Sequence, residues 1–193
     1  MNNHIYVCFT CQRDAKLLPL HRAALSHAAP GAKVYYVFSP EESAQAAPPP
    51  DSYRVIADFP RNGNLLGLPC HLGMLETMQQ LSEANQHAAV IKIDADVYMR
   101  SDSFLDSLGK GHDMVGEYYC KGTCYGMTHG LISKVIHYLT HGYIDRSGRL
   151  EDSTISMAAA IVSDAHKVKI HNAANEDGSE ILYSIFHAGF LNA

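Results

Sequence analysis

Short runs of apolar, β-branched and aromatic residues recur through the first half of the chain, and segments of helical periodicity separate some of them. The runs are residues 4–10, 34–38, 53–57 and 88–93. Because they do not alternate apolar with polar positions, they predict strands that are buried on both faces. Apolar residues at helical spacing predict helices over residues 14–28 and 69–78. This order predicts an α/β fold with a mostly parallel central sheet and helices on both faces.

The second half of the chain predicts a small antiparallel element within the same domain. The expected elements are two neighbouring antiparallel strands over 113–119 and 124–127, helices over 131–139 and from Glu151 onward, and a late strand over 168–171. The chain has 193 residues, and domains commonly have about 100–200, so we expect a single domain over residues 1–193.

Composition narrows the classes of function. The chain has 15 Lys and Arg against 20 Asp and Glu, a formal charge of −5 without a basic cluster, which argues against a nucleic-acid partner. Its apolar runs are far shorter than the roughly 20 residues of a membrane span. The first residues do not resemble a signal peptide, so we expect a cytoplasmic protein and leave peripheral membrane association open. Five cysteines favour free thiols over a disulfide scaffold.

Two carboxylates follow the apolar strand over residues 88–93. Asp94 and Asp96 are separated by one residue, and like charges this close are costly unless a cation lies between them. A hard divalent cation such as Mg²⁺ or Mn²⁺ fits these ligands, and diphosphate oxygens can complete its shell. The pair therefore predicts a metal site that holds a nucleotide diphosphate. The simpler interpretation is two solvated aspartates in a turn.

The acidic pair and its surroundings resemble the nucleotide-sugar glycosyltransferases of the GT-A fold, whose DxD motif follows a central strand. The motif order is most similar to the β-1,3-glycosyltransferase and fringe family. The segments that carry this resemblance are Lys92 before the acidic pair, Asn64-Leu65 before a helix, Gly122 and Tyr125, Glu151-Asp152, and Phe186-His187. One departure is Ala95, because the eukaryotic family commonly has a third acid there.

The resemblance implies a single GT-A, Rossmann-like domain. Residues 1–100 would form the nucleotide-binding half, and residues 101–193 would form the half that binds the acceptor and completes the metal shell. The implied activity is transfer of a sugar from a nucleotide-diphosphate sugar, with UDP as the expected nucleotide, to an acceptor hydroxyl with inversion. The acceptor could be a glycan, a lipid or a protein.

The resemblance also implies the metal ligands and the catalytic base. Asp96 would bind the metal directly, and Asp94 would contact the ribose or bind the metal through water. His187 would complete the shell, and an imidazole ligand points to Mn²⁺ more than to Mg²⁺. Asp152 would take the proton of the acceptor hydroxyl, with Glu151 as the second candidate. For an isolated Asp at a helix start, a capping role is the alternative.

Further residues are expected to bind the donor substrate. These candidates are Thr10, Arg13, Asp58, Asn64, Lys92 and Gly122. For Thr10, Arg13 and Asp58 an ordinary loop position is the competing interpretation, and the Lys92 side chain could simply extend along the sheet toward solvent.

Two other functions stay open at this point. The chain could be a nucleotide-sugar-binding protein without transfer activity. It could also be a zinc-binding module, with a four-thiolate site made by Cys8, Cys11, Cys120 and Cys124. Free, partly buried thiols are the expected state of these cysteines.

Overall fold

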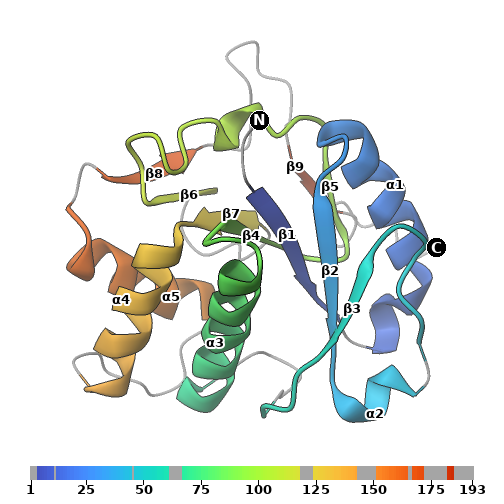
Figure 1. Ribbon diagram of the computed structural model, residues 1–193, viewed down its shortest axis with the longest axis horizontal. Helices are drawn as coiled ribbons and strands as arrows, with labels where there is room; N and C mark the ends of the chain where they lie inside the picture. Colours follow the sequence, from blue (N-terminus) through green and yellow to red (C-terminus); the bar gives the residue numbers. More distant parts are fainter. Residues whose placement is uncertain are drawn as a thin grey trace.

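A twisted β-sheet forms the centre of the fold in the computed structural model, which describes residues 4–10, 12–44, 46–60, 67–117, 124–142, 151–164, 167–171 and 182–184 (Figure 1). Within these residues the sheet has seven strands. Their spatial order is β3 (Tyr53–Ile56), β2 (Lys33–Phe38), β1 (His4–Phe9), β4 (Ala89–Ile93), β7 (Cys124–Met127), β6 (Met114–Glu117) and β8 (Val168–His171).

All neighbouring strands are parallel except where β7 pairs with β4 and with β6. The predicted mostly parallel sheet with an antiparallel part in the second half is therefore confirmed. A separate antiparallel pair consists of β5 (Val97–Met99) and β9 (Leu182–Ser184).

Helices cover both faces of the sheet. Helix α1 (Leu18–Ala28) lies on one face, and α3 (Leu68–Ala84), α4 (His129–Thr140) and α5 (Glu151–Val162) pack together on the other (Figure 1). Pro69 lies in the first turn of α3, where its missing N–H costs nothing. The Thr128 hydroxyl accepts a hydrogen bond from the Leu131 N–H and so begins α4.

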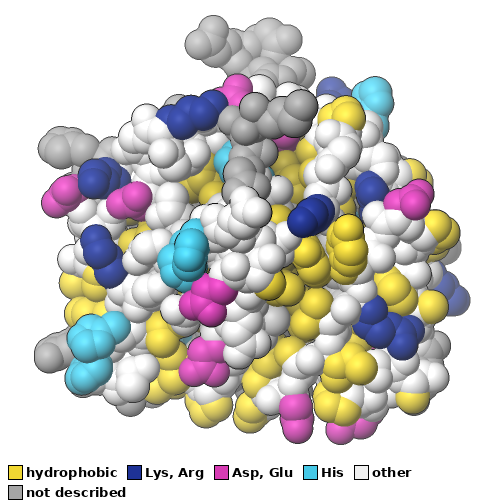
Figure 2. All heavy atoms as spheres, in the orientation of Figure 1, with side chains coloured by type: hydrophobic (Ala, Val, Ile, Leu, Met, Phe, Trp, Pro, Cys, Tyr) yellow, Lys and Arg dark blue, Asp and Glu magenta, His cyan; other side chains and the backbone are white. Residues whose placement is uncertain are grey.

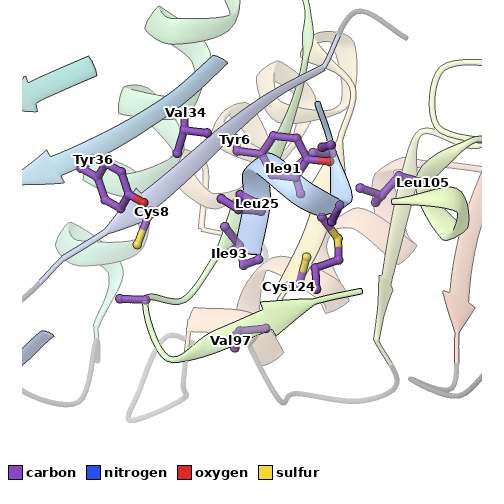
Figure 3. Close-up of a cluster of buried hydrophobic side chains, with 14 of the residues drawn as sticks. Tyr6, Cys8, Leu25, Val34, Tyr36, Ile91, Ile93, Val97, Leu105 and Cys124 are labelled. Atoms are coloured by element: carbon purple, nitrogen blue, oxygen red, sulfur yellow. The ribbon is translucent and has the colours of Figure 1, made fainter. Parts of the chain in front are cut away.

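The alternation of side chains along each strand divides the core into two clusters. In β1, Tyr6 and Cys8 face the α1 side, whereas Ile5 and Val7 face the α3–α5 side. Figure 3 shows the cluster on the α1 side, where β1, β2 and β4 contribute side chains that pack against Leu25 of α1. Strands β1 and β4 are buried on both faces along most of their length, as their unalternated apolar sequences predict. The same expectation for residues 53–57 is wrong, because β3 is the edge strand of the sheet and its Tyr53 and Ile56 are 49% and 55% exposed.

Several short elements are not predicted from the sequence. They are the short helix α2 (Pro40–Ser43) and the strands β5 and β9, and the helix predicted over residues 14–28 is divided into the 3₁₀ helix η1 (Gln12–Lys16) and α1. Helix α2 starts with a capping box, in which the Ser39 hydroxyl accepts from the Glu42 N–H and the Glu42 carboxylate accepts from the Ser39 N–H. The Ser- and Asp-containing segment over residues 99–111 predicts a short helix, and the structure has there only a 3₁₀ helix, η2 (Ser103–Leu105).

The distribution of charged side chains on the surface agrees with the sequence, which has no basic cluster. On the described part of the face in Figure 2, basic and acidic side chains are interspersed over the helices rather than gathered in one basic patch. In the described part of the chain, no helix has the length and apolar character that a membrane crossing requires.

Candidate active site

The carboxyl ends of the parallel strands bring part of the predicted site, namely Thr10, Asp58, Lys92, Asp94 and Asp96, to one edge of the sheet. Strands β1, β3 and β4 end there, and helix α5 begins there because it leads to β8, which is parallel to β6 (Figure 1). We call this side the carboxyl edge and the opposite side the amino edge. In parallel α/β sheets, ligands bind at the carboxyl ends of the strands.

Lys92 lies in the middle of this region and makes an ion pair with the first acid. Its side chain is 1% exposed, and its Nζ lies 2.7 Å from Asp94 Oδ1. Residues i and i+2 of an extended chain point to the same face, which explains how the two side chains meet. Tyr125 lies directly opposite Lys92 on β7, and Nζ is 5.7 Å from the centre of its ring. An ammonium over an aromatic face is stabilised by the ring quadrupole.

The two predicted metal ligands occupy the turn that follows β4. The Val97 N–H donates to the Asp94 carbonyl, and both Asp94 and Asp96 are half-buried, whereas Ala95 packs into the core. Burial raises the pKa of Asp94, the Lys92 ammonium opposes this rise, and the Asp96 and Asp14 carboxylates add to it. Asp94 therefore lies where a further cation would stabilise its negative charge.

Asp14 is a third carboxylate of this edge, and sequence reasoning missed it. It lies in η1 and is 8% exposed. The pKa of the Cys8 thiol at the end of β1 is raised, first by burial and then by the Asp94 and Asp14 carboxylates. Asp94 and Asp14 therefore both lie within electrostatic range of Cys8. The one available signal was an acid placed shortly after a buried parallel strand.

Thr10 has a defined structural partner. Both its backbone N–H and its hydroxyl donate to the Val37 carbonyl at 3.0 Å, and the residue is 3% exposed. These bonds join the end of β1 to the end of β2. The Thr10 hydroxyl is therefore already bound to the backbone of β2. A role of Thr10 in donor binding stays a prediction, and it would depend on the position of the residue rather than on its hydroxyl.

Asp58 lies on an exposed loop that is held in place by the packing of the next residue, Phe59. The Phe59 ring makes an edge-on contact with Phe9, with ring centres 6.1 Å apart. A Cβ atom at Gly73 of α3 would lie only 2.4 Å from Phe59 Cβ, so Gly73 is needed for this close approach. The packing holds the loop after β3 against the carboxyl edge, where Asp58 was expected.

Some of the predicted residues lie outside what the structure describes. Asn64, Gly122 and His187 are in segments that are not described, and for Arg13, Glu151 and Asp152 only the backbone is described. The roles of these side chains stay predictions. Helix α5 does begin at Glu151, as predicted.

The alternative zinc site has two of its four cysteines in the described residues. Cys8 and Cys124 are buried in the core cluster shown in Figure 3. Cys11 and Cys120 lie outside the described residues. The described residues contain no group of three or more His, Cys, Asp or Glu side chains arranged to hold a metal.

Comparison with known proteins identifies the fold. No protein-family model and no curated protein matches the chain. A glycosyltransferase involved in the glycosylation of the major capsid of PBCV-1 is similar over 94% of this chain and 94% of its own, with a TM-score of 0.58 and 10% sequence identity. The glycosyltransferase GlyE of Streptococcus pneumoniae TIGR4 is similar over 89% of this chain, with a TM-score of 0.52 and 11% identity.

The chain spans 45% of the length of GlyE and nearly all of the PBCV-1 enzyme. Similarity at this level of identity establishes the fold, and it confirms the predicted α/β glycosyltransferase fold. The likeness to the β-1,3-glycosyltransferase and fringe family stays a prediction.

Proposed function

We propose that the protein is a metal-dependent glycosyltransferase, which moves a sugar from a nucleotide-diphosphate sugar to an acceptor hydroxyl. The observation that carries this proposal is the acidic pair Asp94 and Asp96 at the carboxyl end of β4, in a fold shared with two glycosyltransferases. UDP is the proposed nucleotide of the donor, and inversion is the proposed outcome at the anomeric carbon.

The described residues fit a hard divalent cation. Asp94 and Asp96 provide carboxylate oxygens that are half-buried and one residue apart. Mg²⁺ is commonly held by one or two carboxylates together with substrate phosphates rather than by a complete protein cage, and Mn²⁺ accepts the same ligands. Two carboxylates are therefore sufficient on the protein side. When bound, such a cation would neutralise the charge of the departing diphosphate.

The charges around the site support a requirement for that cation. The carboxylates of Asp14, Asp94 and Asp96 and the ammonium of Lys92 all interact electrostatically with Cys8, and together these four groups carry a formal charge of −2. A diphosphate is also an anion and would be repelled by this group of charges. We therefore expect the nucleotide to bind poorly without a divalent cation and well with one.

Asp152 is the proposed catalytic base. Helix α5 begins at Glu151 on the carboxyl edge, so its first turn is on the same side of the sheet as the acidic pair. A carboxylate there would accept the proton of the acceptor hydroxyl while the oxygen attacks the anomeric carbon. Glu151 is the second candidate for this role.

A thermal-shift titration tests donor binding. UDP, GDP and CMP, and one sugar derivative of each, are added with and without Mn²⁺, and the melting temperature is recorded. A ligand that binds only the folded state stabilises it by RT ln(1 + [L]/Kd). We expect the largest gain for UDP and its sugars, and only when Mn²⁺ is present.

Two variants identify the site and separate binding from turnover. Asp96→Asn should abolish the Mn²⁺-dependent gain. Asp164→Asn is the matched control, since Asp164 is an exposed acid whose one ion pair within the described part of the chain is a 3.9 Å contact with Lys167. Equal stabilisation of the Asp96→Asn variant and the wild type would remove Asp96 from the metal site. Release of UDP from a bound UDP-sugar would then distinguish a transferase from a protein that only binds the donor.

A further inference from the structure

Two histidines lie one turn apart at the end of α4. His137 and His141 are four residues apart in the sequence, so their side chains lie on the same face of the helix. Their ring centres are 4.0 Å apart, and both side chains are exposed. In Figure 2 histidine side chains lie side by side at the lower left, where Figure 1 shows the end of α4. This end of the helix therefore presents two adjacent imidazoles at the surface.

The backbone holds the second imidazole in a defined orientation. His141 Nδ1 lies 2.7 Å from the His137 carbonyl oxygen. A carbonyl oxygen only accepts hydrogen bonds, so in the neutral ring Nδ1 carries the proton and Nε2 carries the lone pair. The His141 backbone N–H donates to the same carbonyl at 3.2 Å, which fixes the residue at the end of the helix. Histidines that bind metals commonly donate one ring N–H to a carbonyl in this way and bind the ion through the other nitrogen.

The separation of the two rings suits two nitrogen ligands of one metal ion. Zinc–nitrogen bonds are about 2.0–2.1 Å long, and two such bonds at a tetrahedral angle place their nitrogens roughly 3 Å apart. With ring centres 4.0 Å apart, rotation of the exposed His137 side chain brings its nitrogens within this spacing of His141. Two histidines at positions i and i+4 of a helix are also the zinc ligands of the H-E-x-x-H motif.

The position in the helix and the type of ligand indicate which ion would bind. The last carbonyl groups of a helix carry a partial negative charge, which favours a cation near His137 and His141. Lys134 is the one Lys or Arg of α4, and its side chain is exposed, so solvent screens its repulsion of a cation. Imidazole nitrogens suit Zn²⁺, Cu²⁺ and Ni²⁺, whereas Mg²⁺ and Mn²⁺ prefer oxygen ligands. The pair therefore selects a different class of metal from the acidic pair at the carboxyl edge.

We propose that His137 and His141 form a binding site for a divalent transition-metal ion such as Zn²⁺, with water in the remaining coordination positions. Because both ligands belong to one helical turn, the second bond forms within the same molecule, which can raise the affinity over that of a single histidine by roughly 10²–10⁴-fold. The bound ion would join the last turn of α4 to its C-cap residue. The site is independent of the proposed transfer, and either one can fail without the other.

Titration of the isotope-labelled full chain with Zn²⁺ by NMR tests this site. The titration is made without nucleotide and with excess Mg²⁺, which competes for the carboxylates of Asp94 and Asp96 but not for imidazoles. We expect Zn²⁺ to shift the backbone amide signals of His137, His141 and Gly142 in a saturable manner. Mg²⁺ alone should leave these signals unchanged, because it prefers oxygen ligands.

Two variants assign the ligands. His137→Ala and His141→Ala should each lower the Zn²⁺ affinity at the end of α4 by roughly 10²-fold, because each leaves a single imidazole. Both side chains are exposed, so the variants should stay folded, which the melting temperature without metal checks. His27→Ala is the matched control, since His27 is an exposed histidine in the last turn of α1 with no histidine four residues before or after it. It should leave the affinity at the end of α4 unchanged.

Three results would overturn the proposal. One is the absence of saturable amide shifts at the end of α4. Another is a response confined to His87 and His129, whose ring centres lie 4.4 Å apart, because it would place the ion at that pair of histidines instead. The third is a Zn²⁺ affinity that is the same in His137→Ala, His141→Ala and the wild type.

Discussion

His21 makes the stability of the fold depend on pH. It is fully buried on α1, and its Nδ1 lies 2.9 Å from the Tyr36 hydroxyl, while its Nε2 has no partner among the described residues. Burial, and after it the Arg22 charge, lowers the pKa of His21 from 6.5 to about 4. The imidazole is therefore neutral in the folded protein at pH 7.

The size of the effect follows from the two pKa values. An unfolded chain protonates this histidine near pH 6.5, whereas the folded protein does so only near pH 4. Stability from the neutral imidazole is complete above pH 6.5 and is lost as the pH falls toward 4. The full span is 6.5 − 4 = 2.5 pKa units, which at about 1.36 kcal/mol per unit is about 3 kcal/mol. Roughly 2 kcal/mol of it should be lost by about pH 5.

Urea unfolding near pH 7.5 and near pH 5 measures this loss. The chain has 12 histidines, so a variant must isolate the contribution of His21. The double variant His21→Leu/Tyr36→Phe replaces both partners by apolar groups of similar size, which is often nearly neutral for stability. We expect the wild type to lose roughly 2 kcal/mol more than the double variant on acidification. Equal losses in the two proteins would show that His21 does not have a lowered pKa.

Three further predictions concern the carboxyl edge. Lys92→Met should lower the free energy of unfolding by about 2–3 kcal/mol, measured by urea unfolding. This loss is smaller than for a fully buried ion pair, because Asp94 is 35% exposed. The double variant Lys92→Met/Asp94→Asn should recover part of the loss, because it also removes the unpaired carboxylate. Asp152→Asn should leave the melting temperature and UDP binding unchanged, since Asn caps helices about as well as Asp. It should slow transfer by roughly 10²–10⁴-fold in a UDP-release assay, because Asn cannot accept the proton. Loss of activity in Glu151→Gln instead would assign the base to Glu151. Gly73→Ala should destabilise the fold by roughly 1–3 kcal/mol, because the added Cβ atom would clash with Phe59. Gly130→Ala should instead stabilise α4 by up to about 1 kcal/mol, because a Cβ atom there has nothing within 4 Å. A gain in stability at both glycines would contradict the packing described for Phe59.

The main elements of the fold could be predicted because their signals are local. The run over residues 88–93 is apolar at every position except Lys92, and it became β4 with a shift of one residue at its start. The strand over residues 168–171 was predicted at its observed bounds. The short pair of β5 and β9 could not be predicted in this way, because three-residue strands far apart in sequence carry no periodic signal.

The site was only partly predictable because burial of a charge depends on the tertiary structure. Asp94 and Asp96 stand out since they follow an apolar strand directly. Asp14 lies in a polar stretch that is typical of a solvated helix start, and its burial depends on the tertiary packing of η1, which contacts α1. In the same way, no local pattern indicates that the hydroxyl of Thr10 is bound to β2.

The position of β7 links the fold to the chemistry proposed for this edge. Because β7 runs antiparallel beside β4, Tyr125 lies opposite Lys92 and its ring covers the lysine side chain. Exclusion of water around the ammonium strengthens its attraction to Asp94, since charges interact more strongly at low dielectric. Asp94 is thereby held in one orientation before any ligand arrives, so its ordering is completed during folding. A cation and a diphosphate that bind beside Asp96 would then meet a carboxylate that is already oriented, which lowers the entropic cost of binding.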